Sequence, residues 1–118
     1  MTAVIADDSN ILRFTIKEML KNCGVTNVHE ATNGEDAVNL YKKYKPDFIT
    51  LDVSMDKLDG FEALKLIMEY DPGAKVIMIS SISQDIIVKS AIQIGANDYI
   101  VKPFSQDQIT RAVGRLGG

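Results

Sequence analysis

The sequence predicts a single α/β domain built on an open, doubly wound parallel sheet of five strands with five helices. Two observations lead to this fold class. Segments of strand length, four of them short apolar runs, alternate five times with segments in which apolar residues recur at helical spacing. The connections are short, which is typical of right-handed β–α–β crossovers with helices on both faces of the sheet. Five strands are too few for an eight-stranded barrel, so the sheet must be open.

Four of the five expected strands are short apolar runs of the kind that is buried in a parallel sheet, and the remaining one is a short strand within the more polar segment 25–31. In chain order the strands cover residues 3–6, part of 25–31, 47–51, 76–79 and 99–101. Each expected helix has apolar residues three and four positions apart, with capping residues, glycine or proline near its ends. In chain order the helices run from Ser9 or Asn10 to Gly24, from the Asn33-Gly34 turn to Pro46, from Asp59-Gly60 to Asp71, over 84–94, and over about 105–116.

The order of the strands decides which carboxyl ends meet. In the flavodoxin-like order 2-1-3-4-5, which is common among doubly wound sheets, the first and third strands are neighbours at the switch point. We expect this order, in which Asp7-Asp8 and Asp52 would converge at the switch point, with Ser80 one strand further on.

Polar groups follow four of the five strands directly. Asp7 and Asp8 follow the first strand, Asp52 the third, Ser80 ends the fourth, and Lys102 follows the fifth. Three neighbouring carboxylates repel one another, so this pocket needs a cation, and an oxygen-rich set of ligands suits Mg²⁺. With the metal bound, Lys102 and Ser80 are donors for a second anion, which predicts a phosphoryl site.

With these residues in place, the chain resembles the receiver domain of response regulators in two-component signalling over essentially its whole length, residues 1–118. The matching segments are Asp7-Asp8, residues 52–60, Ser80-Ser81, Gly95-Ala96 and Lys102-Pro103-Phe104.

The resemblance implies a role for each site residue. Asp52 would accept the phosphoryl group. The Mg²⁺ ligands would be Asp8 directly, Asp7 through water, Asp52, and the backbone carbonyl of Ser54. The phosphoryl oxygens would contact the Ser80 hydroxyl, the Ser81 backbone and Lys102. The Lys102-Pro103 peptide bond is expected to be cis, and the domain would catalyse its own phosphorylation and dephosphorylation.

The resemblance also implies a switch between Ser80 and Tyr99, whose ring would follow the hydroxyl inward on phosphorylation. The output surface would be the fourth helix, fifth strand and fifth helix. The fourth helix has more apolar residues than one core-facing stripe requires, including Ile86 and Ile92. We expect this spare face to bind a partner or a second copy; scattered surface apolar residues are the alternative.

Some positions depart from the family pattern. Asp56 stands where the family usually has proline, which removes a rigid residue and adds a negative charge near the site. Ser80 stands in place of the more usual threonine. Ser54 and Ile82 occupy two positions that vary among receivers and tune the lifetime of the acyl phosphate.

The expected function is a signalling switch phosphorylated by a histidine kinase, with Mg²⁺ as cofactor. The chain has no room for an effector domain, and two segments, 8–13 and 97–104, are similar to chemotaxis receivers that bind the flagellar motor switch. A receiver excised from a DNA-binding transcription regulator is the alternative. A phosphatase of the haloacid dehalogenase type is disfavoured, because position 54 would need an acid.

Composition excludes other classes. A formal charge of −3 gives no reason to expect nucleic-acid binding by this domain. No apolar stretch approaches a membrane span, and no signal peptide precedes the first strand, so the cytoplasm is the expected compartment. Cys23 is the sole cysteine and His29 has no ligand partner nearby, so we interpret both as structural. A monomer or a phosphorylation-dependent dimer is expected.

Overall fold

The computed structural model describes residues 1–117 and contains all ten predicted elements. The strands are β1 (Thr2–Ala6), β2 (Asn27–Ala31), β3 (Phe48–Leu51), β4 (Val76–Ser80) and β5 (Asp98–Val101). The helices are α1 (Asn10–Asn22), α2 (Gly34–Tyr44), α3 (Gly60–Tyr70), α4 (Asp85–Ile94) and α5 (Gln106–Leu116). All neighbouring strands are parallel, and their order is β2-β1-β3-β4-β5, which confirms the flavodoxin-like prediction.

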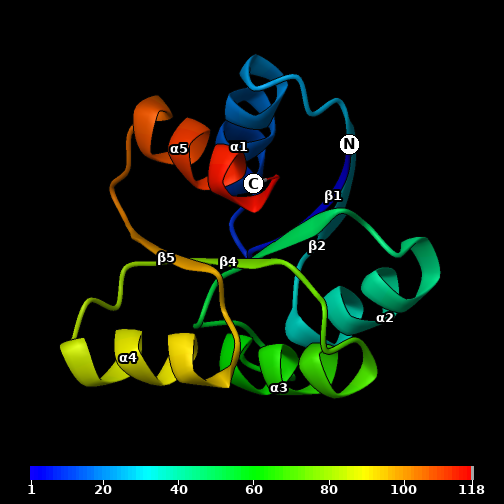
Figure 1. The fold of residues 1–118 in the computed structure, drawn as a ribbon, viewed down its shortest axis with the longest axis vertical. Coiled ribbons are helices and arrows are strands. Elements are labelled where there is room, and N and C mark those ends of the chain that lie inside the picture. The colour runs from blue at the N-terminus through cyan, green and yellow to red at the C-terminus, as the bar shows by residue number, and fades with distance from the viewer. Residues whose placement is uncertain (118) are drawn as a thin grey trace.

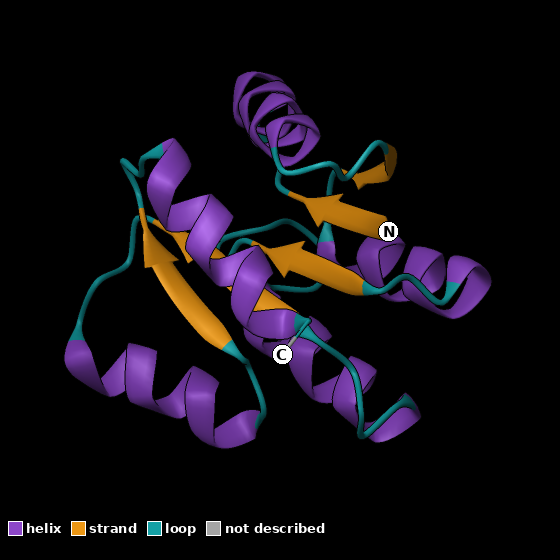
Figure 2. Ribbon diagram, turned by 45° about the horizontal axis from the view of Figure 1, so that its top comes forward, coloured by secondary structure: helices purple, strands orange, loops and turns teal. Residues whose placement is uncertain are grey.

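The sheet separates two layers of helices, as Figure 1 shows: α1 and α5 cover one face, and α2, α3 and α4 cover the other. Each layer has its own core cluster because side chains alternate between the two faces of a strand. In β3, Phe48 packs with Ile16 of α1 and Ile109 of α5, whereas Ile49 and Leu51 pack on the opposite side with residues of α2 and α3. Figure 2 shows the central strands enclosed between these layers.

Side-chain caps explain where most helices begin. Ser9 accepts a hydrogen bond from the Leu12 amide at 3.2 Å, and Asp59 accepts one from the Glu62 amide at 2.9 Å. Ser105 starts α5 with a capping box. These bonds satisfy amides that have no partner within the helix.

The fourth helix is attached more loosely than the others. Its N-cap residue, Gln84, makes no side-chain capping bond, and Ala91 is its one buried residue. Ile86 and Ile92 are 73% and 46% exposed, as the sequence predicts for a helix with a spare apolar face. Across residues 1–117, the helices are too short or too polar to traverse a lipid bilayer.

Candidate functional site

The carboxyl ends of β1 and β3 place two aspartates side by side. Ala6 of β1 is in register with Leu51 of β3, so the residues that follow them, Asp7 and Asp52, are also neighbours. The Asp52 amide continues the ladder by donating to the Ala6 carbonyl at 3.0 Å. Both aspartates are buried, with 1% and 5% of their surface exposed. Two buried carboxylates this close require positive charge beside them.

Lys102 supplies that charge from the end of β5. Its Nζ donates to Asp7 Oδ2 at 2.8 Å and to Asp52 Oδ2 at 2.9 Å. Desolvation lowers the pKa of Lys102, but the hydrogen bonds and charges of the two aspartates outweigh this effect, and the pKa is raised overall. The ammonium therefore stays charged at neutral pH.

Asp8 lies at the solvent-exposed rim of the same site. One carboxylate oxygen from each of Asp7, Asp8 and Asp52 can be chosen so that all lie within 4.8 Å of one another. Loss of hydration at this rim, with the negative charges of Asp7 and Asp52, raises the pKa of Asp8. A set of carboxylate oxygens that destabilises its own negative charge fits a hard divalent cation such as Mg²⁺.

Backbone groups of the loop after β3 position Asp52. The Ser54 amide donates to Asp52 Oδ1 at 3.3 Å, and the Gly60 amide donates to the Val53 carbonyl at 2.8 Å. Gly60 is packed so closely that a Cβ there would lie 2.1 Å from the Asp52 carbonyl oxygen. Glycine at position 60 is therefore a requirement of the close approach between α3 and the end of β3.

The same loop contains a tight turn that the sequence did not reveal. Lys57 has φ of 65°, and the Leu58 amide donates to the Asp56 carbonyl at 2.7 Å, which defines a γ-turn. Asp56 is exposed and lies outside the carboxylate group that could hold a cation. Gly34 at the start of α2 packs against this turn, because a Cβ there would lie 1.9 Å from the Leu58 carbonyl oxygen.

Ser80 and Tyr99 are connected through one residue of the loop after β4. Ser80 is fully buried, and its hydroxyl accepts from the Ile82 amide at 3.2 Å. The Tyr99 hydroxyl donates to the Ile82 carbonyl at 2.5 Å. Burial raises the pKa of Tyr99 and the negative charge of Asp52 adds to this effect, which together outweigh the lowering effect of the Ser80 side chain. Ser81 is exposed, and the Lys102-Pro103 peptide bond is cis as expected.

Sequence reasoning missed Arg13, a buried arginine in the first turns of α1. Its Nη1 donates to the backbone carbonyl of Asp7 at 2.7 Å. The available signal was the position of Arg13 three residues before Ile16 and seven before Leu20, which places an arginine on the core-facing stripe of α1. The residues interpreted as structural behave as such: His29 stacks on Tyr44 with ring centroids 3.6 Å apart, and the Cys23 thiol donates to the Met19 carbonyl.

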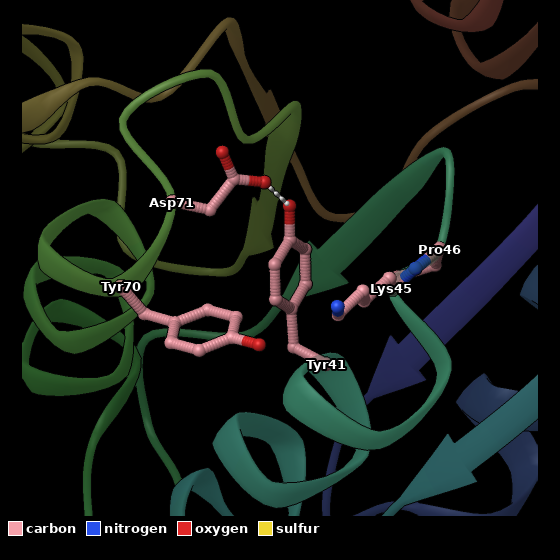
Figure 3. Close-up of a pocket in the computed structure, with 5 residues that line it drawn as sticks. All are labelled: Tyr41, Lys45, Pro46, Tyr70 and Asp71. Carbon is pink, nitrogen blue, oxygen red and sulfur yellow. Dashed lines mark hydrogen bonds between the residues drawn. The ribbon is translucent and has the colours of Figure 1, made fainter.

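A separate pocket of about 280 Å³ lies at the C-terminal ends of α2 and α3, away from Asp7, Asp8 and Asp52 (Figure 3). It is lined by Tyr41, Lys45, Pro46, Tyr70 and Asp71. The Tyr41 hydroxyl donates to Asp71 Oδ2 at 2.7 Å. Because Pro46 and Asp71 precede β3 and β4, this pocket is at the amino ends of the strands, opposite the edge that holds the acids.

Comparison with known proteins shows the family of this chain. The family model of the response regulator receiver domain matches residues 3–114. The chain is 43% identical to protein CcdB of Bacillus subtilis, covering 100% of this chain and 99% of that protein. It is 46% identical to the chemotaxis protein CheY of Listeria monocytogenes over 93% of this chain and 92% of that protein.

Among solved structures, the CheX–CheY–BeF3–Mg²⁺ complex from Borrelia burgdorferi aligns with a TM-score of 0.96 and 33% identity, covering 100% of this chain and 90% of that chain. The family match, the strand order and the placement of the acids agree. The chain belongs to the response regulator receiver domain family.

Proposed function

We propose that this receiver is a phosphorylation-driven signalling switch in which Asp52 accepts a phosphoryl group from a phosphohistidine of a histidine kinase. The observation that carries the proposal is the position of Asp52, a buried carboxylate that lies beside Asp7 and is bridged to it by the Lys102 ammonium, with Asp8 at the open rim. A structural ion pair alone would not need a third carboxylate, held close to two others and exposed to solvent.

The transfer exchanges one bond to phosphorus for another. A carboxylate oxygen of Asp52 attacks the phosphorus, the P–N bond to the donor imidazole breaks, and the imidazole nitrogen keeps the electron pair and takes a proton. Lys102, which now bridges two aspartates, can turn one N–H toward the incoming phosphoryl oxygens. Preorganised positive charge of this kind is the main source of catalysis in phosphoryl transfer.

Asp7, Asp8, Asp52 and the backbone carbonyl of Ser54 would hold Mg²⁺. When bound, the metal supplies positive charge to the phosphoryl oxygens and offsets the repulsion between them and the carboxylates. The Ser80 hydroxyl and the Ser81 backbone would donate to the remaining oxygens. Hydrolysis reverses the modification: water attacks the phosphorus, the acyl phosphate P–O bond breaks, and Asp52 and inorganic phosphate are released.

The switch would act through Ile82, whose amide bonds Ser80 and whose carbonyl bonds Tyr99. A phosphoryl group that draws the Ser80 hydroxyl toward itself would break the bond to the Ile82 amide and shift the loop before α4. Weak attachment of α4 suits this role, because this helix has one buried residue and its N-cap residue makes no side-chain capping bond.

The output surface would be α4, β5 and α5, with Ile86 and Ile92 as exposed apolar contacts. A flagellar motor switch protein is the proposed partner, since several relatives are chemotaxis proteins. Changing Ile86 and Ile92 to Ser should abolish capture of that partner by the phosphorylated form. Unchanged affinity and oligomeric state would contradict this surface. If the phosphorylated form instead bound a DNA-binding transcription regulator, the transcription-regulator alternative would be favoured.

The phosphorylation itself is tested with acetyl phosphate and Mg²⁺, followed by intact-mass spectrometry. The expected product gains one phosphoryl group, is sensitive to hydroxylamine, and is absent in Asp52→Asn. Asp59→Asn is the matched control, because Asp59 caps α3 outside the site. Steady hydrolysis of assorted phosphate esters, without a stable adduct, would indicate a phosphatase.

A further inference from the structure

We propose that Arg13 is a positioning residue for the metal site: it fixes the peptide between Asp7 and Asp8 and thereby sets the affinity of the site for Mg²⁺. This inference rests on the proposed function of the same site. It concerns a residue that contacts neither the phosphoryl group nor the metal.

Arg13 is anchored on three sides. Its side chain is 9% exposed, and Nη1 donates to the Asp7 carbonyl at 2.7 Å. Nε donates to Glu30 Oε1 at 3.1 Å, and Nη2 donates to Asn10 Oδ1. These acceptors belong to the end of β1, to β2 and to the start of α1, so one planar group joins three segments. A lysine could not do the same, because its single ammonium cannot match a fork of acceptors.

The bond to Asp7 matters because of what the peptide plane contains. The Asp7 carbonyl shares one rigid plane with the Asp8 amide and the Asp8 Cα. Fixing that oxygen therefore fixes the orientation of the peptide plane from which the Asp8 side chain projects.

The other polar groups of Asp7 are already occupied. Its amide donates to the Ala31 carbonyl at 3.1 Å, Oδ1 accepts from the Ser9 amide at 2.9 Å, and Oδ2 accepts from Lys102. Arg13 takes the carbonyl and completes the set. Asp8, by contrast, is exposed at the rim, so its placement depends on the backbone before it.

Charge and position predict opposite effects, which makes the inference testable. If Arg13 acted only as a positive charge near three carboxylates, removing it would strengthen Mg²⁺ binding. If it positions Asp8, removing it weakens binding, and residues that orient metal ligands typically change metal affinity by about 10–100-fold.

The experiment measures the Mg²⁺ dissociation constant of the unphosphorylated full chain by isothermal titration calorimetry. Arg13→Met should bind about tenfold more weakly than wild type, and Arg13→Lys should fall between them. Lys17→Met is the matched control, because Lys17 Nζ lies 3.7 Å from Glu30 Oε2 and the lysine side chain is half-exposed. Its loss should change the Mg²⁺ affinity less than about twofold.

A second measurement separates positioning from general damage. The rate of phosphorylation by acetyl phosphate is followed as a function of Mg²⁺. Arg13→Lys should need more Mg²⁺ for half-maximal rate, while its rate at saturating Mg²⁺ stays within about twofold of wild type. Loss of rate at saturation with an unchanged Mg²⁺ requirement would overturn the inference.

The remaining outcomes are also decisive. Binding by Arg13→Met that equals or exceeds that of wild type overturns the inference and leaves the proposed function intact. If Arg13→Met does not fold, Arg13→Lys decides by the same criterion. If the wild type itself binds Mg²⁺ but acquires no phosphoryl group, the proposed function fails, whereas the affinity comparison still tests Arg13.

Discussion

The hydroxyl of Tyr99 donates to the backbone carbonyl of Ile82 at 2.5 Å, across the gap between β5 and the loop that leads into α4. The amide of Ile82 is bonded to Ser80, so this residue links the buried end of β4 to the aromatic ring on β5. The loop position is therefore set by hydrogen bonds to two side chains, and breaking either should loosen it.

Replacing Tyr99 with Phe should free the loop without disturbing the acids. The lost hydrogen bond should cost about 1 kcal/mol in the free energy of unfolding. Amide hydrogen exchange over residues 81–84 should accelerate, since the Ile82 carbonyl no longer has its partner. Tyr70→Phe, which alters an exposed ring on α3, should change neither measurement, and equal exchange in all three proteins would contradict the proposed link.

Replacing Lys102 with Met should have opposite effects on metal binding and on phosphoryl transfer. Mg²⁺ should bind on the order of tenfold more tightly, because no ammonium shares Asp7 and Asp52 or repels the cation. Phosphorylation by acetyl phosphate should slow by about 10²-fold, since a donor to the transferred oxygens is gone. Calorimetry measures the Mg²⁺ affinity and mass spectrometry the rate of phosphorylation, with Lys75→Met, at an exposed lysine, as control. Weaker metal binding by Lys102→Met would contradict the idea that the Lys102 ammonium and Mg²⁺ compete for Asp7 and Asp52.

Replacing Gly60 with Ala should damage the site through packing alone. The new Cβ would lie 2.1 Å from the Asp52 carbonyl oxygen, so the backbone must shift, at a cost of about 1–3 kcal/mol. The same change at Gly114 in α5 meets no atom within 4 Å and should raise stability by up to about 1 kcal/mol. Urea unfolding measures both, and a neutral effect at position 60 would contradict the observed packing.

Replacing Lys57 with Gly should stabilise the fold. Lys57 has φ of 65°, a conformation that costs a side-chain-bearing residue roughly 1–2 kcal/mol. The extra freedom of glycine in the unfolded chain lowers stability by about 0.4–1 kcal/mol, which leaves a net gain of up to roughly 1.6 kcal/mol. Lys65→Gly, inside α3, should instead lose about 1 kcal/mol. Thermal unfolding would detect the difference in sign.

Replacing Tyr41 with Phe should flatten the loss of stability at alkaline pH. Burial and the bond to Asp71 raise the pKa of Tyr41, so the folded state keeps this proton after the unfolded chain has lost it near pH 10. Stability therefore falls as pH rises above about 10, and ionisation of Tyr41 in the unfolded chain contributes to this fall. Urea unfolding between pH 9 and 11 should show a steeper decline for wild type; parallel declines would contradict this account.

The main site residues were predictable because four of the five strands are apolar runs that stop at a polar residue. Asp7, Asp52 and Lys102 could be placed together once parallel pairing fixed which strand ends are neighbours. Two capping residues were also predictable, because Ser9 and Asp59 are short polar side chains directly before segments in which apolar residues recur at helical spacing.

Two features could not be predicted because their sequence signals are ordinary. Lys57 adopts positive φ at a position where glycine or asparagine would have marked the turn. Arg13 looks like any helical surface arginine until β2 brings Glu30 beside it and the Asp7 carbonyl turns toward it. Both depend on contacts between segments, whereas propensity and periodicity describe single segments.

The bond from Lys102 to Asp7 joins residues separated by 95 positions in the chain. A growing polypeptide on the ribosome thus lacks this ammonium until β5 and the residue after it have emerged. Asp52 leaves the exit tunnel long before that, with no ammonium to steady it. The order of synthesis itself therefore delays the neutralisation of these two buried carboxylates until the segment that follows β5 has emerged.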